Sequence, residues 1–254
     1  MNLRMVAVAA LAVLVAGCAD GGAAAPPSPE QRTLTVFAAA SLTEVFNQLE
    51  PQFEQAHPGV DVVFNYGASS DLAQQIVNGG PADLFAAANT STMKTVSDAG
   101  LVDGQPTVFA TNVLEIVTPP GNPAGIKSFA DLARPDLKVV VCAPQVPCGS
   151  AAEKIEKATG VTLNPVSEEP DVKSTLGKVT TGNADAGLVY ATDVNAAGNT
   201  VQGVEFPEAE QAVNDYPIAV IANAPNADIA HAFHQLVTGA EGKAALQSAG
   251  FGSP

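Results

Sequence analysis

The chain has 254 residues, of which 46% are hydrophobic, and its formal charge at pH 7 is −15. This length and apolar content suffice for one large domain or two of ordinary size. The acidic excess argues against nucleic acid or anionic lipid as a partner, because both require clustered lysine and arginine. It does not exclude a small anion, since a pocket binds through local dipoles and exposed charges are screened beyond about 8 Å.

The first 17 residues have the organisation of a bacterial export signal. Arg4 precedes an apolar run that ends in small residues directly before Cys18. This run is too short to span a bilayer, which takes about 20 apolar residues. We therefore predict a lipoprotein signal peptide over 1–17, with Cys18 as the site of lipid attachment. Residues 18–32 are rich in Gly, Ala and Pro and predict a lipidated, disordered tether on the extracytoplasmic face of the cell membrane.

Strand and helix patterns alternate from Leu34 onward. A pattern typical of a capping box, Ser41 to Glu44, opens the first predicted helix, and a serine turn at Ser69 precedes the second. The expected strands in this half are 34–38, 60–66, 82–88 and 113–118, and the later helices are 72–77 and 93–98. Such alternation predicts a mainly parallel sheet that is covered on both faces.

The pattern restarts after the Pro119-Pro120-Gly121 break. A β-branched strand at 137–143 is followed by a turn at 144–149 and by a second capping-box pattern, Ser150 to Glu153. The remaining expected elements are helix 171–182, strands 186–190 and 216–222, and helices 229–237 and 241–248.

The fold class is therefore α/β, with two lobes and a return crossing of the chain between them. We expect lobe 1 to comprise 33–112 plus 217–254, and lobe 2 to comprise 113–216. In open parallel sheets, ligands bind beyond the carboxyl ends of the strands. A cleft between the two lobes is the expected ligand site.

Three turns at predicted strand ends, around Ser41, Ser69 and Cys148, contain neither Lys nor Arg. A helix N-terminus offers unpaired amides and a positive dipole end, so it favours an anion without a cationic side chain. Each serine has a simpler interpretation as a helix cap. Their clustering at strand ends favours binding of a small oxyanion.

Two cysteines, Cys142 and Cys148, remain once Cys18 is assigned to lipid. An even pair at close spacing in an oxidising compartment favours a local structural disulfide. Two free thiols or a redox-active pair are the alternatives. A zinc site is poorly supported, because the histidines lie far from both cysteines in the sequence.

Five motifs together resemble the molybdate-binding proteins of ABC importers, in order and over about 33–252. These motifs are Thr35–Thr43, Tyr66–Leu72, Pro81–Phe85, Val146–Gly149 and Gly187–Asp193. The resemblance implies a type II periplasmic-binding-protein fold, in which two Rossmann-like lobes close around a tetrahedral dianion.

The resemblance also implies a ligand set made of neutral donors. Ser41 and Ser69 would each supply a hydroxyl and an amide, Tyr190 its phenol, and Cys148 and Val172 their backbone amides. The metal arrives as molybdate, or as tungstate, so molybdenum has no direct protein ligand and no cofactor is needed. The expected partner is the permease of an ABC importer in the cytoplasmic membrane, and the protein itself is expected to be a monomer.

One substitution within these motifs bears on the ligand. Asp71 stands where relatives have an uncharged residue, so its carboxylate needs to point away from a bound dianion. Facing the cleft, it would instead suit phosphate, which carries a proton and requires an acceptor.

The alternatives to molybdate are another tetrahedral oxyanion, such as sulfate or phosphate, or a small organic acid. Enzymatic activity is not expected. A serine hydrolase lacks support because there is no Gly-x-Ser-x-Gly motif, and a thiol oxidoreductase would have to use Cys142 and Cys148.

Overall fold

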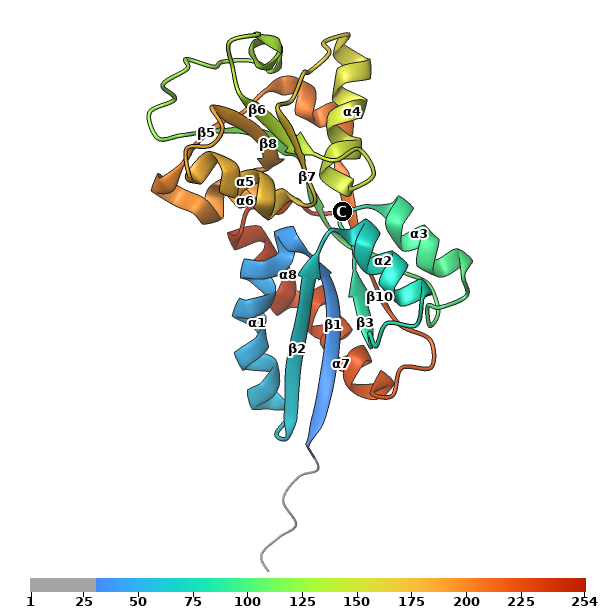
Figure 1. Cartoon of the computed structure of the whole chain (residues 1–254). Coiled ribbons are helices and arrows are strands. Elements are labelled where there is room, and N and C mark those ends of the chain that lie inside the picture. Colours follow the sequence, from blue (N-terminus) through green and yellow to red (C-terminus); the bar gives the residue numbers. More distant parts are fainter. Residues whose placement is uncertain (1–30) are drawn as a thin grey trace, which may run out of the picture.

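The computed structural model describes residues 31–254, which form two α/β lobes (Figure 1). The predicted signal peptide, Cys18 and almost all of the predicted tether lie outside the described residues. Arg32 was expected in the tether but begins the first strand, because it pairs in register with Val60 of the second strand. No helix in residues 31–254 is long and apolar enough to cross a membrane.

The first lobe is built on a five-stranded mixed sheet with strand order β2-β1-β3-β10-β4. Its strands are β1 (Arg32–Ala39), β2 (Val60–Gly67), β3 (Leu84–Ala86), β4 (Thr107–Asn112) and β10 (Asn214–Val220). β1, β2 and β3 are parallel, whereas β10 runs antiparallel to both of its neighbours. The helices of this lobe are α1 (Thr43–Ala56), α2 (Ser69–Val77), α3 (Thr90–Asp98), α7 (Ala227–Thr238) and α8 (Ala240–Ser248).

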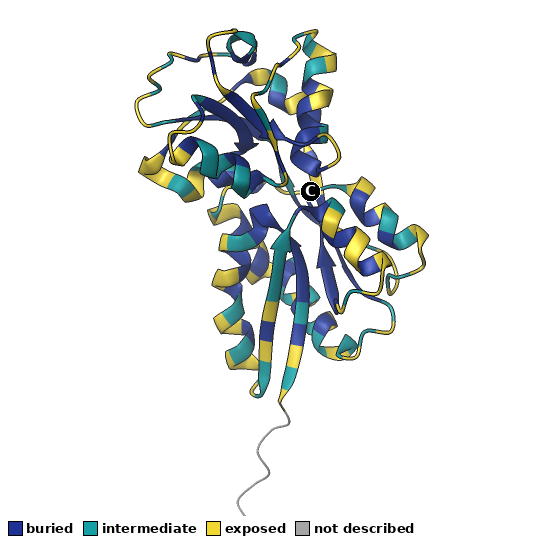
Figure 2. Cartoon of the chain, viewed as in Figure 1, coloured by how far each residue is buried: buried dark blue, intermediate teal, exposed yellow. Residues whose placement is uncertain are grey.

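The two faces of this sheet carry separate hydrophobic clusters. In β1, Leu34 and Val36 pack in the cluster that includes α1, α7 and α8, whereas Phe37 packs in the one that includes α2 and α3. This is the alternation that a strand covered on both faces requires. Phe233 of α7 contacts Phe53 of α1 edge to face, with 5.1 Å between ring centroids. Figure 2 shows the resulting layers, with buried residues on the strands and on the inner helix faces.

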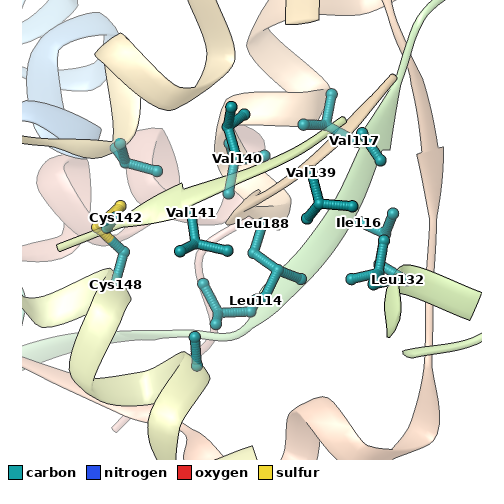
Figure 3. Close-up of a cluster of buried hydrophobic side chains, with 14 of the residues drawn as sticks. Leu114, Ile116, Val117, Leu132, Val139, Val140, Val141, Cys142, Cys148 and Leu188 are labelled. Carbon is teal, nitrogen blue, oxygen red and sulfur yellow. A yellow bond between two sulfur atoms is a disulfide. The ribbon is translucent and has the colours of Figure 1, made fainter. Parts of the chain in front are cut away.

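The second lobe repeats this plan with strand order β7-β6-β8-β5-β9. Its strands are β5 (Leu114–Thr118), β6 (Val139–Cys142), β7 (Ser167–Glu169), β8 (Ala186–Tyr190) and β9 (Gln202–Val204), and its helices are α4 (Pro147–Thr159), α5 (Val172–Thr180) and α6 (Ala191–Ala197). Short 3₁₀ turns are η1 (Ala40–Leu42), η2 (Phe129–Ala133), η3 (Gly198–Thr200) and η4 (Pro207–Ala212), of which η1 belongs to the first lobe. Every residue of the central strands β5, β6 and β8 is buried, and Figure 3 shows Val139, Val141 and Leu188 within one hydrophobic cluster.

The chain passes between the two sheets twice, at Val113 and at Val213. The crossings are adjacent, because Asn112 at the end of β4 pairs with Asn214 at the start of β10. The return was predicted after residue 216, three residues too late. Tyr216 already pairs with Ala110 of β4, so it belongs to the first sheet.

Both predicted capping boxes are wrong. Ser41 lies in η1, and its hydroxyl bonds to Tyr216 instead of capping α1, which begins at Thr43. Helix α4 begins at Pro147 and not at Ser150, so the expected turn is already the first helical turn. Proline is favoured at the first helical position, because a backbone N–H there has no intrahelical acceptor and proline therefore loses no hydrogen bond. The sequence patterns also missed β4, β7, β9 and α6; β7, β9 and α6 are short and only partly apolar.

A buried carboxylate lies on β5 of the second lobe. Glu115 is 9% exposed and lines a cavity together with Glu205 and Glu210. Burial, reinforced by the charge of Glu205, raises the pKa of Glu115 to about 7. A raised folded-state pKa means that the folded protein holds this proton more tightly than the unfolded chain. The resulting stability is present below about pH 4.5 and is lost as the pH rises toward 7.

Replacing Glu115 with Gln is expected to raise the free energy of unfolding at pH 8 by about 1–2 kcal/mol, a figure discounted for partial solvent screening. The gain should shrink to a few tenths of a kcal/mol at pH 4.5, where the carboxyl is protonated in the folded state and about half protonated in the unfolded chain. Urea denaturation at both pH values measures the difference. The exposed Glu153→Gln on α4 is the control, and an equal change for the two variants at pH 8 would contradict the assignment.

Candidate anion-binding site

A small cavity of about 20 Å³ lies where the two lobes meet. Residues of both lobes line it: Ala39, Ala40, Ser41, Gly67, Ala68, Ser69, Ala88, Val146, Pro147, Cys148, Asp171, Val172 and Tyr190. All five residues that the sequence predicted as ligand-binding are among them. The geometry thus brings together groups that are as far apart in the sequence as Ser41 and Tyr190.

Three of the predicted residues lie in the first turn of helices that follow strands. Ser69 is the first residue of α2, Cys148 the second of α4 and Val172 the first of α5. Backbone amides in the first helical turn have no intrahelical acceptor, and the helix dipole places partial positive charge there. Three helix N-termini therefore direct amide donors and positive dipole ends at one cavity, which is the arrangement that binds an anion.

The three hydroxyl groups at the cavity are held from behind by buried partners. The Ala88 amide donates to Ser69 Oγ at 2.9 Å, and Asn214 Nδ2 donates to Tyr190 Oη at 2.7 Å. Ser41 Oγ lies 2.9 Å from the Tyr216 hydroxyl. Burial raises the pKa of Tyr190 well above its ordinary value, so its phenol is a neutral donor at physiological pH.

Charged groups at the cavity are few and already paired. Among residues 31–254, Asp171 is the one acidic residue in the cavity wall, and its carboxylate accepts from the Ser174 amide as the N-cap of α5. The neighbouring Lys173 ammonium lies 2.8 Å from Glu44 of α1 and 2.9 Å from Asp193. Burial alone would lower the pKa of Lys173, but the two carboxylates outweigh it and the pKa is raised. The cavity wall therefore presents neutral donors.

Asp71 does not supply an acceptor to this cavity. It lies on the exposed side of α2, within 3.4 Å of the Ser70 hydroxyl, and is not part of the wall. A bound dianion requires the Asp71 carboxylate to lie away from the cavity, and the structure places it there. In residues 31–254, no group of three or more His, Cys, Asp and Glu side chains is placed to hold a metal ion.

The structure joins Cys142 and Cys148 in a disulfide (Figure 3). The bridge ties the end of β6 to the first turn of α4, with 5.7 Å between the two Cα atoms. Of the alternatives open from the sequence, the structural bridge is the one present. It restrains the turn that carries the Cys148 amide.

The residues behind the cavity were missed by sequence reasoning. Tyr216 and Asn214 lie on β10, and Asp193 in α6 accepts the Tyr190 amide at 3.1 Å. In the sequence, Asn214 precedes an apolar strand and has no motif of its own. Only the pairing of β10 with β4 and β3 brings it to the crossing between the lobes.

Two lobes, a cavity between them and convergent neutral donors define an extracytoplasmic solute-binding protein of the α/β class. Residues 34–252 match the bacterial extracellular solute-binding protein family, and the chain belongs to that family. It is 49% identical over 256 residues to the molybdate-binding protein ModA of Mycobacterium tuberculosis (strain ATCC 25618 / H37Rv), with 100% of this chain and 98% of the relative covered. The resemblance to molybdate-binding proteins that the motifs indicated is confirmed.

Two further relatives extend the comparison. A Bacillus subtilis (strain 168) protein named as an ABC transporter substrate-binding lipoprotein, YvgL, is 30% identical, with 94% of this chain and 93% of the relative covered. The periplasmic molybdate-binding protein of Azotobacter vinelandii superposes with a TM-score of 0.75 at 22% identity, covering 87% of this chain and 99% of that one. This likeness confirms the predicted two-lobed binding-protein fold.

The first turn of α4 depends on Gly149. A Cβ atom at this position would lie 2.0 Å from the Ala143 carbonyl oxygen and 2.7 Å from that of Cys142, so the turn could not approach β6 as closely. We expect Gly149→Ala to lower the free energy of unfolding by about 2 kcal/mol through overpacking.

The matched control is Gly177→Ala in α5, where an added Cβ would meet no heavy atom within 4 Å. That change should raise stability by about 0.5–1 kcal/mol, because alanine is the better helix former. Denaturant unfolding of both variants measures the contrast. A neutral or stabilising Gly149→Ala would show that the close approach is not required.

Proposed function

We propose that this protein binds molybdate, and also tungstate, in the cavity between its lobes and delivers it to the permease of an ABC importer. The observation that carries the proposal is the convergence of Ser41, Ser69, Cys148, Val172 and Tyr190 on one cavity whose wall presents neutral donors. The 49% identity to a molybdate-binding protein over the full chain supports the choice of ligand.

The donor chemistry of the cavity suits a fully deprotonated dianion. Hydroxyl groups and unpaired amides donate, and the Asp171 carboxylate is engaged by the Ser174 amide. Molybdate, tungstate and sulfate need only donors near neutral pH, whereas hydrogen phosphate also needs an acceptor for its proton. Donor-only chemistry therefore disfavours phosphate. The role proposed is transport without catalysis.

The same proposal assigns the location of the protein. Lipid attachment at Cys18, followed by a short tether, would hold the two lobes on the extracytoplasmic face of the membrane. A Bacillus subtilis relative that is named as a lipoprotein supports this assignment. The lobes, 32–112 with 214–254 and 114–212, would act as a monomer and close about the crossings at Val113 and Val213.

Isothermal titration calorimetry of the purified protein tests the ligand. Molybdate and tungstate are expected to bind with one site per chain, sulfate far more weakly, and phosphate without detectable heat. The absence of heat with molybdate, together with tight binding of sulfate or phosphate, would assign the protein to another oxyanion.

Replacing both Ser41 and Ser69 with Ala tests the site. Two hydrogen bonds to a charged ligand contribute about 1.5–3 kcal/mol each, so molybdate should bind at least about 100-fold more weakly. Ser97→Ala on α3 is the control, because its hydroxyl bonds to the Met93 carbonyl in its own helix. Full affinity in the double variant, with an unchanged melting temperature, would show that these serines do not contact the ligand.

A further inference from the structure

A hydroxyl group at the cavity is held ready to donate to a ligand when its own oxygen already accepts from another donor. A hydroxyl has one proton and two lone pairs, so it can face an anion through the proton or through the lone pairs. The second orientation would repel an oxyanion. A donor behind the cavity that binds the hydroxyl oxygen favours the first orientation before the ligand arrives.

One side chain behind the cavity reaches both lobes. Asn214 is 2% exposed, and its Nδ2 donates to Tyr190 Oη of the second lobe at 2.7 Å and to the Ala88 carbonyl of the first at 2.8 Å. The amide of the same Ala88 donates to Ser69 Oγ at 2.9 Å. A carboxamide nitrogen carries two protons and cannot accept, so these bonds have a fixed direction.

The consequence for the cavity follows from this direction. The phenol oxygen of Tyr190 accepts from Asn214, which leaves its proton to be donated, either to the neighbouring Tyr216 hydroxyl or to a bound ligand. The hydroxyl oxygen of Ser69 accepts from the Ala88 amide, and Asn214 restrains the same residue by binding its carbonyl, which belongs to the following peptide. Asn214 thus contacts the Tyr190 hydroxyl directly and restrains the Ser69 hydroxyl through Ala88.

We propose that Asn214 is a positioning residue that holds the hydroxyls of Tyr190 and Ser69 as hydrogen-bond donors toward the bound oxyanion. The inference rests on the proposed function, because it concerns the same cavity. It also gives the interlobe bond a role in binding, since Asn214 and Tyr190 belong to different sheets. The bond between the Asn214 amide and the Tyr190 phenol therefore links the donor arrangement to the relative position of the two lobes.

Two substitutions separate the donor role of Asn214 from its volume and from charge. Asn214→Leu has a similar volume but no donor, and Asn214→Asp replaces the donor with a carboxylate that accepts the Tyr190 proton. The titratable groups near this position are the phenols of Tyr190 and Tyr216 and the Asp193 carboxylate. A buried carboxyl has a raised pKa, so protonation of the new Asp near pH 5.5 restores one donor.

The experiment is calorimetric titration of molybdate at pH 8.5 and pH 5.5, with each variant compared with the wild type at the same pH. At pH 8.5 both variants should bind about 30-fold or more weakly, as expected for lost hydrogen bonds to a charged ligand. At pH 5.5, Asn214→Asp should recover at least about fivefold relative to Asn214→Leu, which stays weak. Asn122→Asp is the control, because its amide donates to the Ile126 carbonyl on the surface of the second lobe and should keep wild-type affinity throughout.

Two results would overturn the proposal. One is wild-type affinity for molybdate in a folded Asn214→Leu variant. This variant tests the proposal by itself if Asn214→Asp does not fold. The other is a loss in Asn214→Asp of the same size as in Asn214→Leu at both pH values, which indicates packing alone. A wild-type protein that gives no heat with molybdate overturns the proposed function as well, so the two failures are distinguishable.

Discussion

Neutral donors from two separate sheets must meet in one cavity, and the architecture follows from this requirement. A single helix N-terminus supplies a few amides, but α2, α4 and α5 together surround the cavity from both lobes. Their first turns lie close together because each follows the carboxyl end of a strand, and the two sheets present these ends to each other. The serine and tyrosine hydroxyls complete the set, each hydrogen-bonded to a buried neighbour.

The charged side chains beside the cavity are held in ion pairs. Lys173 follows a cavity residue directly, yet its ammonium bridges Glu44 of the first lobe and the fully buried Asp193 of the second. Burial raises the pKa of Asp193, and the nearby ammonium opposes this effect. The partly exposed Lys173–Glu44 pair adds only a modest interlobe contact. A chain with a formal charge of −15 can therefore present hydrogen-bond donors to an anion, with the Asp171 carboxylate of the cavity wall engaged by the Ser174 amide.

The crossing between the lobes links the fold to the cavity. Asn112 and Asn214 pair where β4 leaves the first sheet and β10 enters it. One residue beyond the return crossing, the Asn214 side chain reaches Tyr190 in the second sheet and Ala88 in the first. The return crossing that joins the lobes thus also carries Asn214, the side chain that orients the donors. A change in the relative position of the lobes alters both at once.

The sequence by itself determined the α/β alternation, most strand positions and the five residues that meet at the cavity, since apolar periodicity and turn chemistry are local properties. Strand β8 matches its predicted bounds, because it is a short, uniformly buried run that ends at a polar segment. The tertiary structure decided the role of Ser41, whose hydroxyl bonds to Tyr216, 175 residues away, and not to its own helix. It also decided the roles of Asn214 and Lys173, whose partners come from other strands and helices. Such contacts depend on strand order and on the second crossing, which no local pattern encodes.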